Sequence, residues 1–103
     1  MDRIARIKEM LQLSPQDNFL QHALALEYIK LGKEKEARQL FEEILLRDPA
    51  YIGSYYHLGK LLERNGETML AEEWYRKGMD AAQKAGDHHA FRELQSAYEE
   101  LAT

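Results

Sequence analysis

The chain has 103 residues, of which 45 % are hydrophobic, and this length and composition suit one compact domain. It contains no cysteine, which excludes disulfides, thiol catalysis and cysteine-ligated zinc and suits a cytoplasmic protein. A formal net charge of -4 at pH 7 argues against a general nucleic-acid binder, which needs a dominant basic surface to displace counterions from phosphates. No apolar run approaches the roughly 18 residues that a membrane helix requires, so no membrane association is expected.

Two prolines, Pro15 and Pro49, divide the chain into helical stretches, because proline has no amide hydrogen and ends a helix. Before the first proline, residues 3–13 are predicted as a helix. Between the two prolines, Gly32 separates two amphipathic helices. Apolar residues at spacings of three and four predict these helices at 18–31 and 35–47.

The second half of the chain follows the same scheme. A helix is predicted at 52–65, a turn at Gly66 and a longer partner helix at 67–85. Gly86 then permits a left-handed helix end, and Asp87 caps a last helix. The expected order is six helices, and the fold class is all-α.

The chain also matches itself at an offset of 34 residues, so one helical unit is expected to stack on copies of itself. The matched pairs are Leu24 with Leu58, Ala25 with Gly59, Gly32 with Gly66, Ala37 with Ala71, and Phe41 with Tyr75. The same offset pairs Ile7 with Phe41, Met10 with Ile44, Leu11 with Leu45, and Pro15 with Pro49. The helix at 3–13 is therefore expected to be half a repeat.

These landmarks resemble the tetratricopeptide repeat, a 34-residue helical hairpin whose copies stack into a right-handed α-solenoid. The second unit carries the landmark residues Tyr55, Leu58, Gly59, Leu62, Gly66, Ala71 and Tyr75. In the first unit Gln21 stands where an aromatic is usual, and in the last helix Phe91, Leu94 and Tyr98 return after two extra residues. The resemblance implies one domain with a half repeat at 1–15, repeats at 18–51 and 52–85, and a capping helix at 86–103.

The resemblance further implies a non-catalytic protein-protein interaction module, which binds a peptide or partner-protein segment in a concave groove. By register, the groove residues are Phe19, His22, Leu26, Ile29, Lys30, Tyr56, Lys60, Arg64, His89 and Arg92. The apolar members have no evident core role, and such exposed patches mark contact sites; the alternative for Phe19 and Ile29 is that they fill space between helices. Lys60 and Arg64 beside Tyr56 predict an acidic partner.

Other functions have less support in the sequence. A clamp for acidic chaperone tails is not expected, because His22, Leu26 and His57 stand where that clamp needs Lys and Asn. Adjacent His88 and His89 point about 100 degrees apart on a helix, so no metal site is expected, and no residues suggest an enzyme or a cofactor. The main alternative is structural self-association, as a homodimer or larger scaffold, through repeat ends or exposed apolar faces.

Overall fold

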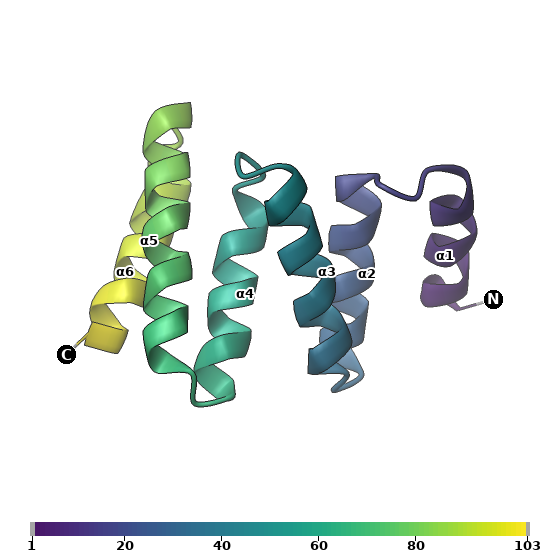
Figure 1. The fold of residues 1–103 in the computed structure, drawn as a ribbon, viewed down its shortest axis with the longest axis horizontal. Helices are drawn as coiled ribbons and strands as arrows, with labels where there is room; N and C mark the ends of the chain where they lie inside the picture. Colours follow the sequence, from purple (N-terminus) through teal and green to yellow (C-terminus); the bar gives the residue numbers. More distant parts are fainter. Residues whose placement is uncertain (1, 103) are drawn as a thin grey trace.

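The computed structural model describes residues 2–102, and this part of the chain folds into six α-helices. They are α1 (Arg3–Leu13), α2 (Asn18–Lys30), α3 (Glu34–Arg47), α4 (Gly53–Arg64), α5 (Thr68–Ala85) and α6 (His88–Ala102). The helices follow one another from α1 at one end to α5 and α6 at the other, along a molecule of 43 × 29 × 20 Å (Figure 1). The all-α class and the order of six helices are confirmed.

The helices alternate between two types. We call α2, α4 and α6 first-type helices and α1, α3 and α5 second-type helices, after their places in the hairpins α2–α3 and α4–α5. Each hairpin turns at a glycine with positive φ, 76° at Gly32 and 79° at Gly66. The next amide in each turn donates to a carbonyl five residues earlier, Lys33 to Tyr28 and Glu67 to Leu62. The two turns are thus the same structure repeated.

Most predicted helix ends lie within one residue of the observed ends. Asp87 caps α6 as expected, because its Oδ1 accepts from the amide of Ala90 over 3.0 Å. Asp2 and Asp17 cap α1 and α2 in the same way. Leu31, predicted as the last residue of the helix at 18–31, lies just beyond the end of α2 and is exposed, because the chain already turns there toward Gly32.

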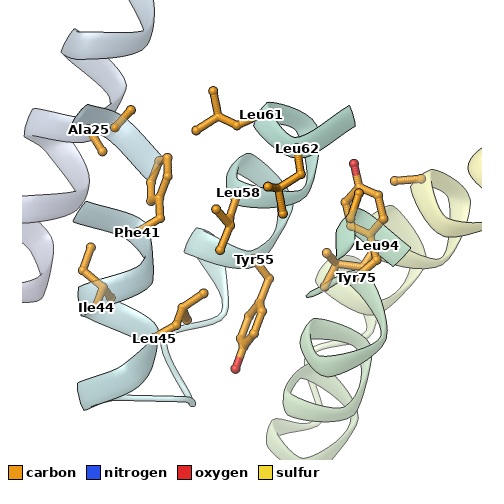
Figure 2. Packing of buried hydrophobic residues seen from close by; sticks show 13 residues of the cluster. Ala25, Phe41, Ile44, Leu45, Tyr55, Leu58, Leu61, Leu62, Tyr75 and Leu94 are labelled. Carbon is orange, nitrogen blue, oxygen red and sulfur yellow. The ribbon is translucent and has the colours of Figure 1, made fainter. Parts of the chain in front are cut away.

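The core runs through the middle of the stack, between α3, α4 and α5 (Figure 2). Phe41, Leu58 and Tyr75 are fully buried there, and each stands at a repeat landmark. Gly59 lets α4 approach α5 closely, because a Cβ at this position would overlap the ring of Tyr75. Gly78 lets both α4 and α6 approach α5, because a Cβ there would lie 2.7 Å from the Cβ of Tyr55 and 3.0 Å from Leu94 of α6.

A histidine pair joins the two hairpins. His22 Nδ1 of α2 and Ser54 Oγ of α4 are hydrogen-bonded over 2.9 Å, and Ser54 is fully buried. The His22 ring lies 5.5 Å from the His57 ring and 5.4 Å from the Phe41 ring, measured between centroids. Burial, with a smaller contribution from His57, lowers the pKa of His22 to about 4. Both rings are therefore neutral at pH 7, since burial also lowers the pKa of His57.

The close approach at Gly59 predicts a destabilised variant. Gly59→Ala should lower the free energy of unfolding by about 1–3 kcal/mol, because overpacking against Tyr75 outweighs the better helix propensity of alanine. Urea denaturation would measure it. Gly53→Ala is the matched control in the same helix, since its Cβ would meet only His22 Cε1 at 3.8 Å. Equal stability of the two variants would contradict this account.

The buried His22 predicts acid-sensitive stability. Its folded-state pKa of about 4 lies below the ordinary 6.5, so the unfolded chain takes up the proton first as the pH falls. The stability contributed by neutral His22 is complete above pH 6.5, declines below it and is lost near pH 4. His22→Gln should therefore flatten the decline of Tm across this window, measured by circular dichroism. His89→Gln, at an exposed residue of α6, should leave the decline unchanged.

Candidate functional site

A hollow of about 350 Å³ lies along α2, on the side that faces the first turn of α1. Its lining comprises Arg3, Phe19, His22, Ala23, Leu26, Glu27 and Lys30. Four of these residues, Phe19, His22, Leu26 and Lys30, are groove residues that the sequence predicts. The structure therefore brings four of the five predicted groove residues of α2 together, leaves out Ile29 and adds Arg3 of α1 to the wall.

The apolar groove residues differ in their surroundings. Phe19 is 70 % exposed. Leu26, Ile29 and Tyr56 are partly buried and pack against the core, so the expectation that they lack a core role is wrong. The reason is that helices of adjacent repeats meet over a wide face, which includes positions outside the landmarks. Phe19 alone among the four keeps most of its surface available to a partner.

Glu27 is a charged residue of the hollow that the sequence reasoning missed. Its Oε2 lies 3.2 Å from Arg3 Nε and 3.1 Å from Lys30 Nζ, and its side chain is only 16 % exposed. The spacing of Glu27 and Lys30, three residues apart on a helix, is the signal that predicts their pairing. Arg3 gives no such signal, because it comes from another helix. Lys30 thus carries a charge that Glu27 already partly neutralises.

On α4, Tyr56 and Lys60 lie together. The Lys60 ammonium is 5.5 Å from the centroid of the Tyr56 ring and 3.5 Å from Glu63 Oε2. Glu63 also accepts a hydrogen bond from the Tyr75 hydroxyl, and burial together with this carboxylate raises the pKa of that hydroxyl. Glu63 therefore connects the cation of the groove to the core between α4 and α5.

Arg64 does not join Lys60 and Tyr56 as the sequence reasoning expected. Its Nε donates to Glu34 Oε2 over 2.8 Å, which ties the end of α4 to the start of α3. This pairing follows from position, because a cation in the last helical turn and a carboxylate in the first turn each complement the helix dipole. His89 and Arg92 are exposed on α6. Of the two basic residues predicted beside Tyr56, only Lys60 lies next to its ring.

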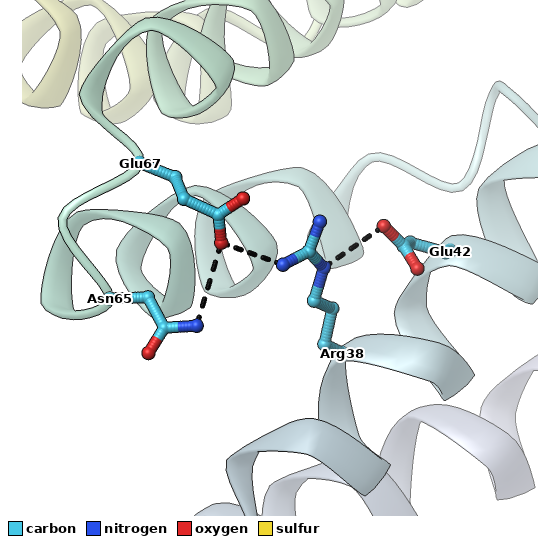
Figure 3. A network of polar contacts seen from close by, with 4 residues as sticks. All are labelled: Arg38, Glu42, Asn65 and Glu67. Atoms are coloured by element: carbon cyan, nitrogen blue, oxygen red, sulfur yellow. Dashed lines mark hydrogen bonds and ion pairs between the residues drawn. The ribbon is translucent and has the colours of Figure 1, made fainter.

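A second polar network, formed by Arg38, Glu42, Asn65 and Glu67, links the two hairpins (Figure 3). Arg38 of α3 donates to Glu42 over 3.2 Å and to Glu67 over 2.7 Å. Asn65 donates to the same Glu67 oxygen over 3.5 Å. This network fixes the α4–α5 turn against α3, and its charges are already engaged with one another.

Two further properties concern the part of the chain that the structure describes. Within residues 2–102, no three or more His, Cys, Asp or Glu side chains gather closely enough to hold a metal ion. None of the helices in this range combines the length and the apolar character needed to cross a bilayer.

Comparison with known proteins identifies the repeat. A profile of the tetratricopeptide repeat matches residues 20–51 and 52–85. A tetratricopeptide repeat domain protein from Salinibacter ruber is 41 % identical over 84 % of this chain and 96 % of that one, with a TM-score of 0.81. A Bordetella parapertussis protein is 27 % identical over 99 % of this chain and 89 % of its own, with a TM-score of 0.84.

A more distant structure shares the fold. The Sgt2 TPR domain from Aspergillus fumigatus is 22 % identical, with a TM-score of 0.78 over 96 % of this chain and 66 % of that one. The two matched repeats cover more than half of the sequence, and they coincide with the hairpins α2–α3 and α4–α5. The chain belongs to the tetratricopeptide repeat family.

Proposed function

We propose that this chain is a non-catalytic protein-protein interaction module that holds a peptide or partner-protein segment in a concave groove along its first-type helices. The observation that carries the proposal is the hollow along α2, in which the exposed ring of Phe19 stands beside Leu26. An aromatic side chain in that position offers a large apolar contact area at small entropic cost. Membership of the tetratricopeptide repeat family, whose fold generally serves protein interaction, supports the same function.

The charges around the hollow favour a ligand with acidic side chains. Arg3 and Lys30 share the single carboxylate of Glu27, and Lys60 pairs with Glu63. The Arg3 and Lys30 side chains are 67 % and 71 % exposed, so a carboxylate of a ligand can pair with them while both stay beside Glu27. We therefore infer an apolar segment that carries acidic residues, bound across α2 and α4.

Catalysis is not part of this proposal. His22 and Ser54 are hydrogen-bonded and resemble the first two members of a nucleophilic triad. Ser54 is fully buried, however, so no substrate can reach its hydroxyl. Burial also lowers the pKa of His22 to about 4, which makes it a weak base at neutral pH. The pair serves the junction between the hairpins, and no cofactor is implied.

Self-association is the alternative function, and one observation favours it. A second hollow, of about 430 Å³, lies between α1 and α2 and shares Arg3, Phe19 and Ala23 with the first. Its wall includes Met10, which is 47 % exposed. A scaffold of several copies would bury this surface against another protomer.

Peptides selected from a random phage-displayed library against the wild-type protein test the groove. Lys30→Glu/Lys60→Glu should weaken the selected peptides about tenfold in fluorescence anisotropy, because two favourable surface charges become repulsive. Phe19→Ala should weaken them as well. The peptides should be enriched in apolar and acidic residues.

Two controls match these variants. Lys35→Glu/Lys84→Glu changes the net charge equally at exposed residues of α3 and α5, and Met69→Ala removes an exposed apolar side chain of α5. Neither should change peptide affinity. Peptides that bind the groove variants and the controls equally well would place binding outside the groove and contradict the proposal.

A further inference from the structure

The second-type helix α1 has an open apolar face. The cleft between α1 and α2 is lined by Arg3, Arg6, Ile7, Met10, Phe19, Leu20 and Ala23. Met10 is 47 % exposed, whereas Ile44, its counterpart at the offset of 34 residues, is fully buried. In the hairpins, that face of a second-type helix packs against a first-type helix. Among residues 2–102, α1 packs mainly against one first-type helix, α2, whereas α3 and α5 each pack against two.

The first-type helix α6 lies at the other end of the stack and has an open face of its own. It packs against α5 and α4 through buried Leu94 and Ala97. When α6 is aligned with α4 at the landmark leucine, Leu94 corresponds to Leu58. Gln95 then corresponds to Gly59, and Glu99 corresponds to Glu63. Gly59 and Glu63 are the residues through which α4 meets Tyr75 of α5. Gln95 and Glu99 therefore mark the face of α6 that fits a second-type helix.

We propose that α6 of a second copy of this chain docks into the cleft between α1 and α2, in the place that a first-type helix would take. In the stack, α4 lies against both α5 and α6. The cleft presents the equivalent surface of α1 and α2, so a helix docked there has two neighbours with which to pack. Successive copies then continue the stack from the α6 end of one to the α1 end of the next.

The sizes of the facing residues are complementary. In the hairpin α4–α5, Gly59 makes room for the large ring of Tyr75. The residue of α1 that corresponds to Tyr75, two repeat offsets earlier in the sequence, is Ile7. Ile7 is smaller than Tyr75. In the docked pair the larger Gln95 therefore faces the smaller Ile7. Beside them, Phe91 of α6, at the place of Tyr55, faces Met10, whose flexible thioether adapts to an aromatic neighbour.

The charges of the two faces are complementary as well. Glu99 would approach Ile7, one turn from Arg3. Arg6 takes the place of Trp74, whose ring lies 6.0 Å from that of Tyr55, and would therefore lie beside Phe91. Within the described range, both Arg6 and Glu99 are exposed and have no ion-pair partner. The overall charges of the two helices are also opposite. Helix α1 carries three basic residues, Arg3, Arg6 and Lys8, and one acidic residue, Glu9. Helix α6 carries three acidic residues, Glu93, Glu99 and Glu100, and one basic residue, Arg92. Opposite charges of this kind select the orientation in which the helices meet.

The contact joins two different surfaces, so it does not close on itself as a two-fold dimer interface does. Each added copy exposes a new α1 cleft or a new α6 face. The assembly should therefore grow with concentration, and added salt should weaken it because charges contribute to the contact.

Sedimentation velocity of the full chain, from micromolar to near-millimolar concentration, tests this inference. The wild-type mass should rise with concentration beyond that of a dimer. Arg6→Glu and Glu99→Lys should each weaken association about tenfold, because each removes the opposite overall charge of one of the two facing helices. An equimolar mixture of the two variants should recover association. In the mixture, the unchanged α1 of the Glu99→Lys chain meets the unchanged α6 of the Arg6→Glu chain, so the native contact forms between the two variants.

Lys35→Glu is the control, at an exposed residue outside both faces, and should associate as the wild type does. A wild type that stays monomeric throughout the range overturns the inference. So does association that persists in both single variants, or a mixture that associates no better than they do. Neither Arg6 nor Glu99 lines the hollow along α2, so peptide binding by these variants tests the proposed groove separately.

Discussion

The contact between Tyr75 and Gly59 determines how closely the two helices of the second hairpin approach, and much of the structure depends on it. The ring fills the space that a glycine leaves on α4. Its hydroxyl donates to Glu63, and Glu63 in turn lies beside Lys60. One aromatic residue of the core thus sets the position of a cation on the surface, and a change in core packing would reach the groove through two polar contacts.

The periodic part of this structure could be predicted from the sequence. Each repeat buries the same face against its neighbours, so the residues of that face recur at a fixed spacing, as Phe41 and Tyr75 do. The six helices and the glycine turns follow from this recurrence. The observed helix ends differ from the predicted ends where a turn competes with the last helical hydrogen bonds, as at Leu31.

The candidate site was less predictable, because its contacts do not recur. His22 and His57 are 35 residues apart, one off the repeat offset, and stand at no landmark, so nothing in the pattern pairs them. Arg64 pairs with Glu34, which lies 30 residues away in the sequence, and only the relative placement of α3 and α4 brings these two side chains together. A repeat predicts which face a residue occupies. It does not predict the partner of a long polar side chain at the edge of that face.

The position of α1 has a consequence for local opening. Ile7 is its only fully covered apolar side chain, whereas α3 and α4 each contribute several to the core. In a stack in which each helix touches mainly its neighbours, the helix with the least covered surface detaches at the lowest free energy. Amide protection should accordingly rise from α1 toward α4. Any molecule that contacts both α1 and α2 suppresses that opening, so its affinity and the order of the first helix are thermodynamically linked.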